Sequence, residues 1–185
     1  MPAYAYAILG AGWLIWMTPF LLRYAKRNTG RLAKLDRRAR WGMLFIAVAY
    51  ALVWQGAFWT RSPGTIRIVL SVLLLAVAGG LSWTGTRALG RQWRLDAGLN
   101  ADHELVQSGP YRLVRHPIYT SMFCVLLGTG LVLATPLPLL LPSILLLIIG
   151  TETRVRVEEK LLASQFGDEF LDYQRRVSAY IPFLK

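Results

Sequence analysis

Charge is missing from most of this 185-residue chain, because charged residues make up only 17 % of it and hydrophobic residues 55 %. Soluble domains carry about 25 % charged residues. The composition therefore excludes an ordinary water-soluble globule and an intrinsically disordered chain. The charge that is present is mostly of one sign, with 21 Lys and Arg against 10 Asp and Glu. A basic excess suits nucleic acid or anionic lipid, and the position of the charges decides between them.

Thiol and imidazole groups are also scarce. Cys124 is the single cysteine, so the chain can form no internal disulfide and no cysteine-based metal site. The two histidines, His103 and His116, have no cysteine cluster to join, which argues against a structural zinc site. The chain also has no internal repeat and no low-complexity tract. We therefore expect no metal cofactor.

Four long stretches contain no charged residue, namely 1–22, 41–60, 68–86 and 116–151. A helix that crosses the hydrocarbon core of a bilayer needs about 20 apolar residues, and the first three stretches provide them. The fourth is too long for one crossing, and Pro136 and Pro138 interrupt it near the middle. We therefore predict a helical hairpin over about 118–134 and 138–152, whose second arm continues beyond the membrane. A nucleic-acid-binding globule would have no reason to partition its charges so sharply.

The pattern predicts an all-α fold, a polytopic integral membrane protein with five transmembrane helices in a single domain, 1–185. Three N-terminal spans occupy 1–86. A core region, 87–185, holds the hairpin of 117–152 and a charged cytoplasmic tail. Residues 1–22 lack the basic start of a signal peptide, so we predict a span there.

Basic residues collect on one side of this arrangement, which contains every Lys and Arg except Arg61 and Arg67. The positive-inside rule makes this side cytoplasmic and places the N-terminus outside. On this side, the basic segment 23–40 carries apolar residues at helical spacing, and we predict a helix that lies in the interface and contacts anionic lipids. The Ala-, Leu- and Arg-rich composition favours a prokaryotic cytoplasmic membrane.

The loop after the third predicted span differs in kind from the other surface segments. It contains both histidines, and His116 stands directly before Pro117 at the start of the hairpin. Proline is favoured at the first position of a helix, whose exposed backbone N–H groups attract an anion. Taken alone, the same residues also fit a simple end to the loop and an anchor for the helix at the interface.

The charged tail opens with ion pairs at helical spacing. Arg154 shares a helix face with Glu158, and Glu152 shares one with Arg156. Judged by composition alone, the pattern also fits a solvated helix that is stabilised by i,i+4 ion pairs and has no functional role. Position favours a functional role, because Arg154 and Glu158 follow the return of the hairpin to the surface, close to His116.

Two motifs, separated by the hairpin, resemble those of the isoprenylcysteine carboxyl methyltransferase and phospholipid methyltransferase superfamily. The first runs from His103 to Tyr119 and reads His-x-Leu-Val-x-Ser-Gly-Pro-Tyr-x-x-x-Arg-His-Pro-x-Tyr. The second opens with Arg154-x-x-x-Glu158-Glu159 and closes with Ile181-Pro182-Phe183. The likeness covers about residues 90–185 and leaves the first three spans without a motif.

The resemblance implies a membrane enzyme that uses S-adenosyl-L-methionine, with a site built from the loop, the hairpin and the tail. The absence of a Gly-x-Gly-x-x-Gly motif agrees with a site that needs no Rossmann sheet. The implied cofactor-binding residues are His103, Glu104, Leu105, Val106, Tyr111, His116, Pro117, Ile118, Tyr119, Glu158 and Glu159. Arg154 and Glu158 are the predicted catalytic residues. Arg154 is also the predicted substrate contact, because a guanidinium can hold a carboxylate bidentately.

The leading prediction is carboxyl O-methylation of a lipophilic acceptor of the isoprenylcysteine type that enters from the bilayer. N-methylation of a phospholipid amine, or methylation of a small thiol or amine, stays open because Arg154 could equally bind a headgroup phosphate. A second hypothesis is a non-enzymatic membrane subunit or a transporter. A transporter would carry ionisable groups at mid-depth in its spans, and none is present there. No nucleic acid partner is expected.

Overall fold

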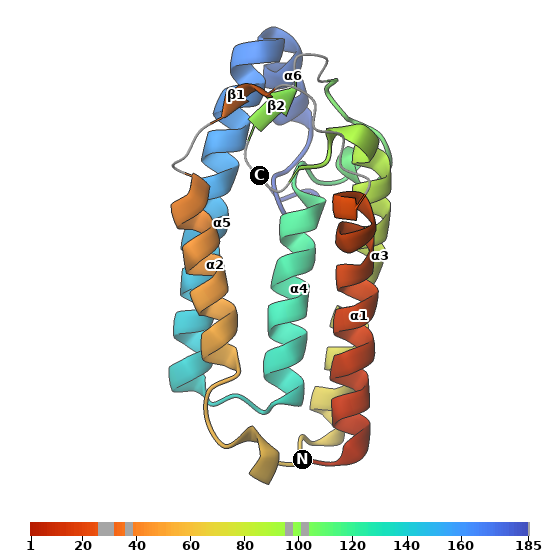
Figure 1. Cartoon of the computed structure of the whole chain (residues 1–185), viewed down its shortest axis with the longest axis vertical. Helices are drawn as coiled ribbons and strands as arrows, with labels where there is room; N and C mark the ends of the chain where they lie inside the picture. Colours follow the sequence, from red (N-terminus) through yellow and green to blue (C-terminus); the bar gives the residue numbers. More distant parts are fainter. Residues whose placement is uncertain (26–31, 36–38, 95–97, 101–103, 185) are drawn as a thin grey trace.

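Residues 1–25, 32–35, 39–94, 98–100 and 104–184 are described by the structure, which is a computed structural model. Its helices are α1 (Ala3–Ala25), α2 (Ala39–Val53), α3 (Thr65–Leu89), α4 (Pro117–Val132), α5 (Leu137–Phe166) and α6 (Asp168–Arg176). Short strands, β1 (Leu32–Leu35) and β2 (Gly98–Asn100), and 3-10 turns, η1 (Phe58–Thr60), η2 (Gly90–Gln92) and η3 (Gly109–Arg112), lie between them. Helices α1 to α5 run side by side along the long axis, and α6 and the strands cover one end (Figure 1).

The predicted all-α, polytopic membrane fold is confirmed. The described residues contain four helical segments that are long and apolar enough to cross a membrane, in α1, α2 with η1, α3 and α5. The fifth apolar helix, α4, has 16 residues and is about 24 Å long, less than the bilayer core of about 30 Å. It lies in the middle of the bundle, and none of its residues is exposed (Figure 1). A helix surrounded by protein does not have to match the lipid thickness.

The predicted hairpin is present, with its turn between Val132 and Leu137. Ala134 adopts a left-handed backbone conformation with φ 47°, and its carbonyl oxygen accepts a hydrogen bond of 2.9 Å from Arg61. Thr135 ties the turn to the end of α2 through a 3.0 Å hydrogen bond to the Val53 carbonyl. The second arm, α5, has 30 residues and is about 45 Å long, so it continues past the membrane as predicted.

The basic segment 23–40 differs from the prediction of a single interfacial helix. Between α1 and α2, residues Leu32–Leu35 form β1, which pairs antiparallel with β2. The backbone groups of β1 therefore find partners far along the chain, and a local spacing of apolar residues cannot reveal such a partner. The prediction is wrong for this part, and the neighbouring residues 26–31 and 36–38 lie outside the described residues.

The helices pack in two groups that leave space between them. Helix α2 packs along α5, while α3 packs along α4 and also contacts α1. Helices α1 and α2 make few contacts with each other. At the end opposite the strands, a hydrophobic cluster joins the two groups; it consists of Ala5, Leu9, Ile46, Ala49, Val53, Leu126, Val132, Leu133 and Leu147. The space between α1 and α2 therefore remains at the end that carries the strands.

Helices α2 and α5 approach each other closely at Gly42 and Gly150. A Cβ atom on Gly42 would lie 2.6 Å from the Gly150 carbonyl oxygen and 2.6 Å from Cγ of Arg154. Small residues allow such backbone approaches in membrane bundles. We expect Gly42→Ala to lower the free energy of unfolding by about 1–3 kcal/mol, measured by unfolding of the purified protein in detergent. Gly80→Ala in α3 is the matched control, because its Cβ would meet nothing within 4 Å. Equal stability of the two variants would contradict a tight α2–α5 contact.

Candidate functional site

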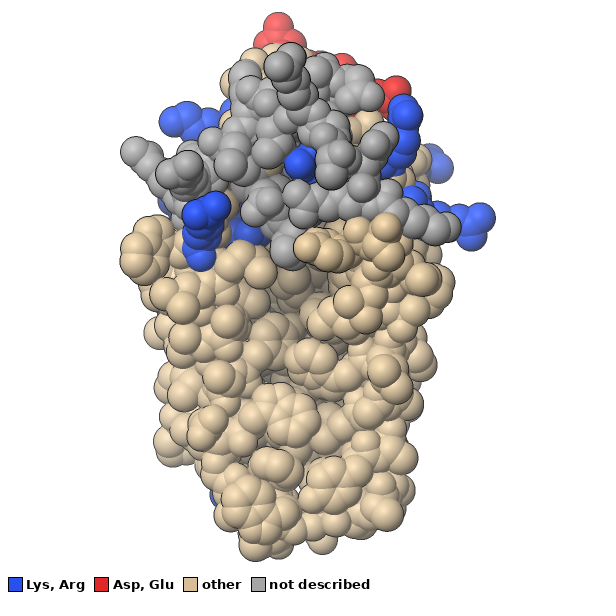
Figure 2. Space-filling view, viewed as in Figure 1, with Lys and Arg blue, Asp and Glu red and all other residues tan. Residues whose placement is uncertain are grey.

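Charged side chains gather at the end of the molecule that carries α6 and the strands, while the rest of the visible face is almost free of them (Figure 2). We call this end the charged end. A cavity of about 680 Å³ extends from it into the bundle, between α1, α2, α4 and α5. Small-molecule sites commonly measure about 300–1,000 Å³, so the cavity is large enough for a cofactor with part of an acceptor.

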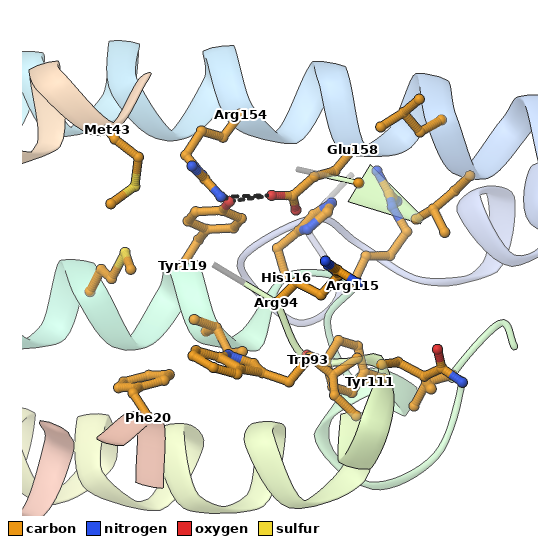
Figure 3. Close-up of a pocket in the computed structure, with 18 of the residues that line it drawn as sticks. Phe20, Met43, Trp93, Arg94, Tyr111, Arg115, His116, Tyr119, Arg154 and Glu158 are labelled. Atoms are coloured by element: carbon orange, nitrogen blue, oxygen red, sulfur yellow. Dashed lines mark hydrogen bonds and ion pairs between the residues drawn. The ribbon is translucent and has the colours of Figure 1, made fainter. Parts of the chain in front are cut away.

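The cavity has an apolar half and a polar half. The apolar half lies deeper in the bundle and is lined by Trp13, Trp16, Met17, Phe20, Met43, Ile46, Tyr50 and Met122. The polar half lies at the charged end, and its polar side chains are Gln92, Arg94, Glu104, Tyr111, Arg115, His116, Tyr119, Arg154, Glu158 and Tyr173. Figure 3 shows the labelled side chains converging on one space from α1, α2, α4, α5 and the connecting segments.

Aromatic side chains close the deep end of the apolar half. The rings of Trp13 and Tyr50 meet edge to face, with centroids 5.4 Å apart, and Trp13 makes a similar contact with Trp16 at 5.5 Å. Their polar atoms bond to α4, since Trp16 Nε1 donates to Ser121 at 2.9 Å and the Tyr50 hydroxyl donates to the Met122 carbonyl at 2.8 Å. The polar atoms of these side chains are therefore satisfied, and the aromatic rings form an apolar wall.

A chain of three side chains stands where the two halves meet. Arg154 Nε donates a hydrogen bond of 2.7 Å to the Tyr119 hydroxyl, and that hydroxyl donates to a carboxylate oxygen of Glu158. The same oxygen lies 3.5 Å from Nη2 of Arg154. Arg154 is only 6 % exposed, although it is a cation at the end of a membrane helix. Helix geometry explains the pairing, because Arg154 and Glu158 lie one turn apart on α5 and Tyr119 faces them from α4 (Figure 3).

Glu159 points in a different direction from Glu158. One oxygen of its carboxylate lies 2.9 Å from Nε of Arg115 and 3.0 Å from Nε2 of His116. The other oxygen accepts a hydrogen bond of 2.9 Å from Gln174 in α6. Arg115 also donates to the backbone carbonyl of Gln174, at 3.1 Å. Glu159 therefore fastens the loop before α4 to α5 and α6, and it does not line the cavity.

The C-terminal segment holds the same loop through backbone bonds. The amide nitrogens of Arg115 and His116 donate to the carbonyls of Ser178 and Ala179, at 2.8 and 3.0 Å. The Tyr173 hydroxyl donates a 2.7 Å hydrogen bond to the Tyr111 carbonyl. Burial raises the pKa of Tyr173 to about 12, and burial also raises the pKa of Tyr111 above its ordinary value. Both phenols are therefore neutral hydrogen-bonding groups at neutral pH.

The structure brings most of the predicted cofactor residues into the wall of one cavity; these are Glu104, Leu105, Val106, Tyr111, His116, Ile118, Tyr119 and Glu158. Pro117 is buried against α3, where its ring would lie 3.7 Å from a Cβ on Gly85. Glu159 stands behind the wall, as described above. His103 lies outside the described residues. The predicted substrate contact, Arg154, lines the cavity at the junction of its two halves.

Sequence reasoning missed the contribution of the first three spans. Trp13, Trp16 and Phe20 follow one another at helical spacing on α1 and all line the cavity. That spacing is a signal, but it is also common on membrane helices that only contact lipid. Among the residues that the structure describes, no group of three or more His, Cys, Asp or Glu side chains could hold a metal ion.

The family of the chain follows from comparisons with known proteins. The model of the phospholipid methyltransferase family matches residues 66–169, which is more than half of the chain and includes nearly all of α3 and the whole of α4 and α5. A protein-S-isoprenylcysteine O-methyltransferase of Saccharomyces cerevisiae is 40 % identical over 84 residues, which are 45 % of this chain and 35 % of the yeast protein. The corresponding protein of Tribolium castaneum is 36 % identical over 86 residues, 46 % of this chain and 30 % of its own length.

A longer match covers a bacterial protein. Nickel-cobalt-cadmium resistance protein NccN of Alcaligenes xylosoxydans xylosoxydans is 31 % identical in an alignment of 156 positions that covers 69 % of this chain and 68 % of that protein. The chain spans about a third of the length of the two isoprenylcysteine methyltransferases. Because the family match extends over more than half of the chain and includes α4 and α5 of the cavity wall, the chain belongs to the phospholipid methyltransferase family.

Proposed function

We propose that the protein is a membrane methyltransferase that uses S-adenosyl-L-methionine and acts on a lipophilic acceptor, with carboxyl O-methylation of an isoprenylcysteine-type substrate as the leading reaction. One observation carries this proposal. The Arg154–Tyr119–Glu158 chain stands between a polar half and an apolar half of the same cavity. A reaction between a polar cofactor and a lipid needs this juxtaposition.

The polar half fits the cofactor by the chemistry of its side chains. Glu158 offers a carboxylate to hydroxyl or ammonium groups, while Tyr111 and His116 offer ring faces with polar edges. Leu105 and Val106 add apolar wall for a nucleoside. When bound, S-adenosyl-L-methionine would supply an electrophilic methyl group on a sulfonium sulfur.

The residues of the chain would act by positioning the acceptor and excluding water. An acceptor carboxylate is already ionised at neutral pH, so it needs no general base. It needs a cation that fixes its direction, and the buried guanidinium of Arg154, which lines the cavity, is the candidate. Holding the reacting atoms in one geometry in dry surroundings is where such an enzyme gains most of its rate.

The lipid portion of the acceptor would occupy the apolar half. Helices α1 and α2 make few contacts with each other, and a recess is visible between them below the charged end (Figure 2). An acceptor could pass from the bilayer through this gap without crossing the polar half. The aromatic wall formed by Trp13, Trp16 and Tyr50 then sets the inner limit of the lipid site.

N-methylation of a phospholipid amine is the second candidate. Arg94 and Arg115 line the polar half beside Arg154, and arginines are suited to a headgroup phosphate. An amine acceptor would have to lose its proton before methylation, whereas an acceptor carboxylate is already ionised at neutral pH. The carboxyl acceptor is therefore favoured over the amine acceptor.

The proposal is tested with purified protein in nanodiscs. Calorimetry should detect binding of S-adenosyl-L-methionine, and labelled methyl groups should pass to a farnesylcysteine analogue as a base-labile ester. A panel with fatty acids and aminophospholipids distinguishes the acceptors. Transfer to the aminophospholipid alone would select the second candidate. If the purified protein binds no S-adenosyl-L-methionine, the hypothesis of a non-enzymatic membrane subunit is favoured instead.

We also propose that the charged end faces the cytoplasm of a prokaryotic cell and that the N-terminus lies outside. The charge distribution supports this orientation through the positive-inside rule. In a Cys124→Ser background, cysteines at Lys34 and Lys185 should react with an impermeant maleimide only after the cells are opened. A cysteine at Trp59, an exposed residue beyond the other end of α2, should react in intact cells. Labelling of Lys34→Cys and Lys185→Cys from opposite sides would overturn the topology.

A further inference from the structure

The apolar half of the cavity ends inside the bundle. On each helix the lining stops at a definite residue, and the deepest of these are Trp13 on α1, Tyr50 on α2 and Met122 on α4. One turn further on, Leu9 and Leu126 belong to the hydrophobic cluster and are at most 3 % exposed. A lipid chain that extends from the polar half into the bundle therefore stops at the aromatic wall.

Trp13 is the most firmly held side chain of this wall. Its ring contacts those of Trp16 and Tyr50, with centroids 5.5 and 5.4 Å away. Its Nε1 donates a hydrogen bond of 3.0 Å to the hydroxyl of Thr129, a buried residue of α4. Moving the ring aside would break this bond where water cannot replace it. The inner end of the apolar half is therefore rigid.

The depth of the apolar half follows from the rise of α2. Gly42 lies against Arg154, because a Cβ on Gly42 would be 2.6 Å from Cγ of Arg154, and Tyr50 follows eight residues later in the same helix. Eight residues of helix measure about 12 Å. An extended chain advances about 1.2 Å per backbone atom, so about ten chain atoms fit between Arg154 and the wall. Phe20 and Met43 line this stretch (Figure 3).

We propose that Trp13 limits the length of the lipid chain and that the preferred acceptor carries a short prenyl group, of about geranyl length. The inference rests on the proposed function and names the acceptor more closely. With its carboxylate at Arg154, a geranyl thioether of cysteine fills the available depth. A geranylgeranyl group is longer by two isoprene units, and its end would collide with the Trp13 ring.

The sides of the apolar half are more adaptable than its end. Met17, Met43 and Met122 line it from three different helices. Methionine is unbranched and flexible, so it fits itself to irregular ligands. The limit therefore acts on the length of the chain and much less on its branching. Helices α1 and α2 lie outside residues 66–169, so the match to the family model does not determine this limit.

Kinetics with a chain-length series test the inference. The acceptors are N-acetylcysteines with geranyl, farnesyl and geranylgeranyl groups, supplied in nanodiscs with concentrations expressed per lipid. In the wild-type protein, kcat/KM should fall along the series, by about tenfold or more between the first and the last compound. In Trp13→Ala this preference should shrink or reverse, because the truncation deepens the apolar half. Trp54→Ala is the matched control, because Trp54 packs against the hydrophobic cluster without lining the cavity, and its preference should equal that of wild type.

The preference is a ratio measured within one protein, so a smaller active fraction of an unstable variant cancels. Trp13→Phe, with a smaller ring, should shift the ratio in the same direction and replaces Trp13→Ala if that variant does not fold. An equal or higher kcat/KM for the geranylgeranyl compound in wild type would mean that the chain leaves through the gap between α1 and α2. That result, an unchanged ratio in the Trp13 variants, or an equal shift in Trp54→Ala would overturn the inference while carboxyl methylation stands. No methyl transfer to any of the three compounds would overturn carboxyl methylation together with the inference.

Discussion

Glu158→Gln is expected to abolish measurable binding of S-adenosyl-L-methionine while the protein stays folded. The substitution keeps the size of the side chain and an oxygen that can accept the Tyr119 hydroxyl, but it removes the charge that faces the cavity. The carboxylate is 26 % exposed and 3.5 Å from Arg154. Because the glutamine oxygen can still accept the Tyr119 hydroxyl and Arg154 keeps its hydrogen bond to Tyr119, the fold should be retained and the loss should fall on binding. Calorimetry on the purified variant measures it, with the melting temperature as a check on the fold.

Glu159→Gln is the matched control, because it makes the same chemical change at the adjacent residue. Glu159 fastens Arg115, His116 and Gln174, and it does not line the cavity. Its replacement should lower the free energy of unfolding by about 2–3 kcal/mol and leave the affinity of the folded protein close to that of wild type. An unchanged affinity in Glu158→Gln would remove Glu158 from the cofactor site.

Arg154→Lys is expected to lower the turnover of the acceptor by at least about tenfold, equivalent to 1.4 kcal/mol of transition-state stabilisation. Lysine keeps the positive charge but loses the planar fork that fixes a carboxylate, and it cannot reproduce the Nε hydrogen bond to Tyr119. The loss should appear in kcat or in the KM of the acceptor, with cofactor affinity changed much less. Steady-state kinetics at saturating cofactor measures the split.

Arg156→Lys provides the comparison on the same helix. The Arg156 side chain is 81 % exposed and pairs with Glu152 across one turn of α5, at 3.3 Å. An exposed pair of this kind tolerates a change of cation. Near-wild-type activity in Arg154→Lys, or an equal loss in Arg156→Lys, would mean that Arg154 belongs to an ordinary solvated helix face.

The membrane fold could be predicted because charge and proline determine it locally. A charge-free run of sufficient length must span or be buried, and Pro136 lies in the turn of the hairpin where a proline disrupts a helix. The loop and tail motifs likewise predicted Arg154, Tyr119 and Glu158 together. Their convergence then followed from the hairpin, which returns α5 past the start of α4.

Other parts of the site depend on packing that no local pattern contains. Glu158 and Glu159 are adjacent and chemically identical, and the rotation of α5 about its own axis decides which one meets the cavity. The close contact of Gly42 with Gly150 fixes that rotation, and it is a pairing between distant segments.

The enclosed position of α4 has a consequence for how the protein assembles in a membrane. Helices α1, α2, α3 and α5 expose large hydrophobic side chains, as independently inserted segments must, whereas α4 exposes none. Helix α4 is also shorter than the bilayer is thick, so its final depth depends on its neighbours, which hold it through Trp13, Trp16 and Tyr50. Because α4 carries Tyr119, the cation–phenol–anion chain can form only after the inserted helices have associated. Insertion of the spans and formation of the site are therefore separate events in the biogenesis of this protein. A variant can reach the membrane with every span in place and still lack a site.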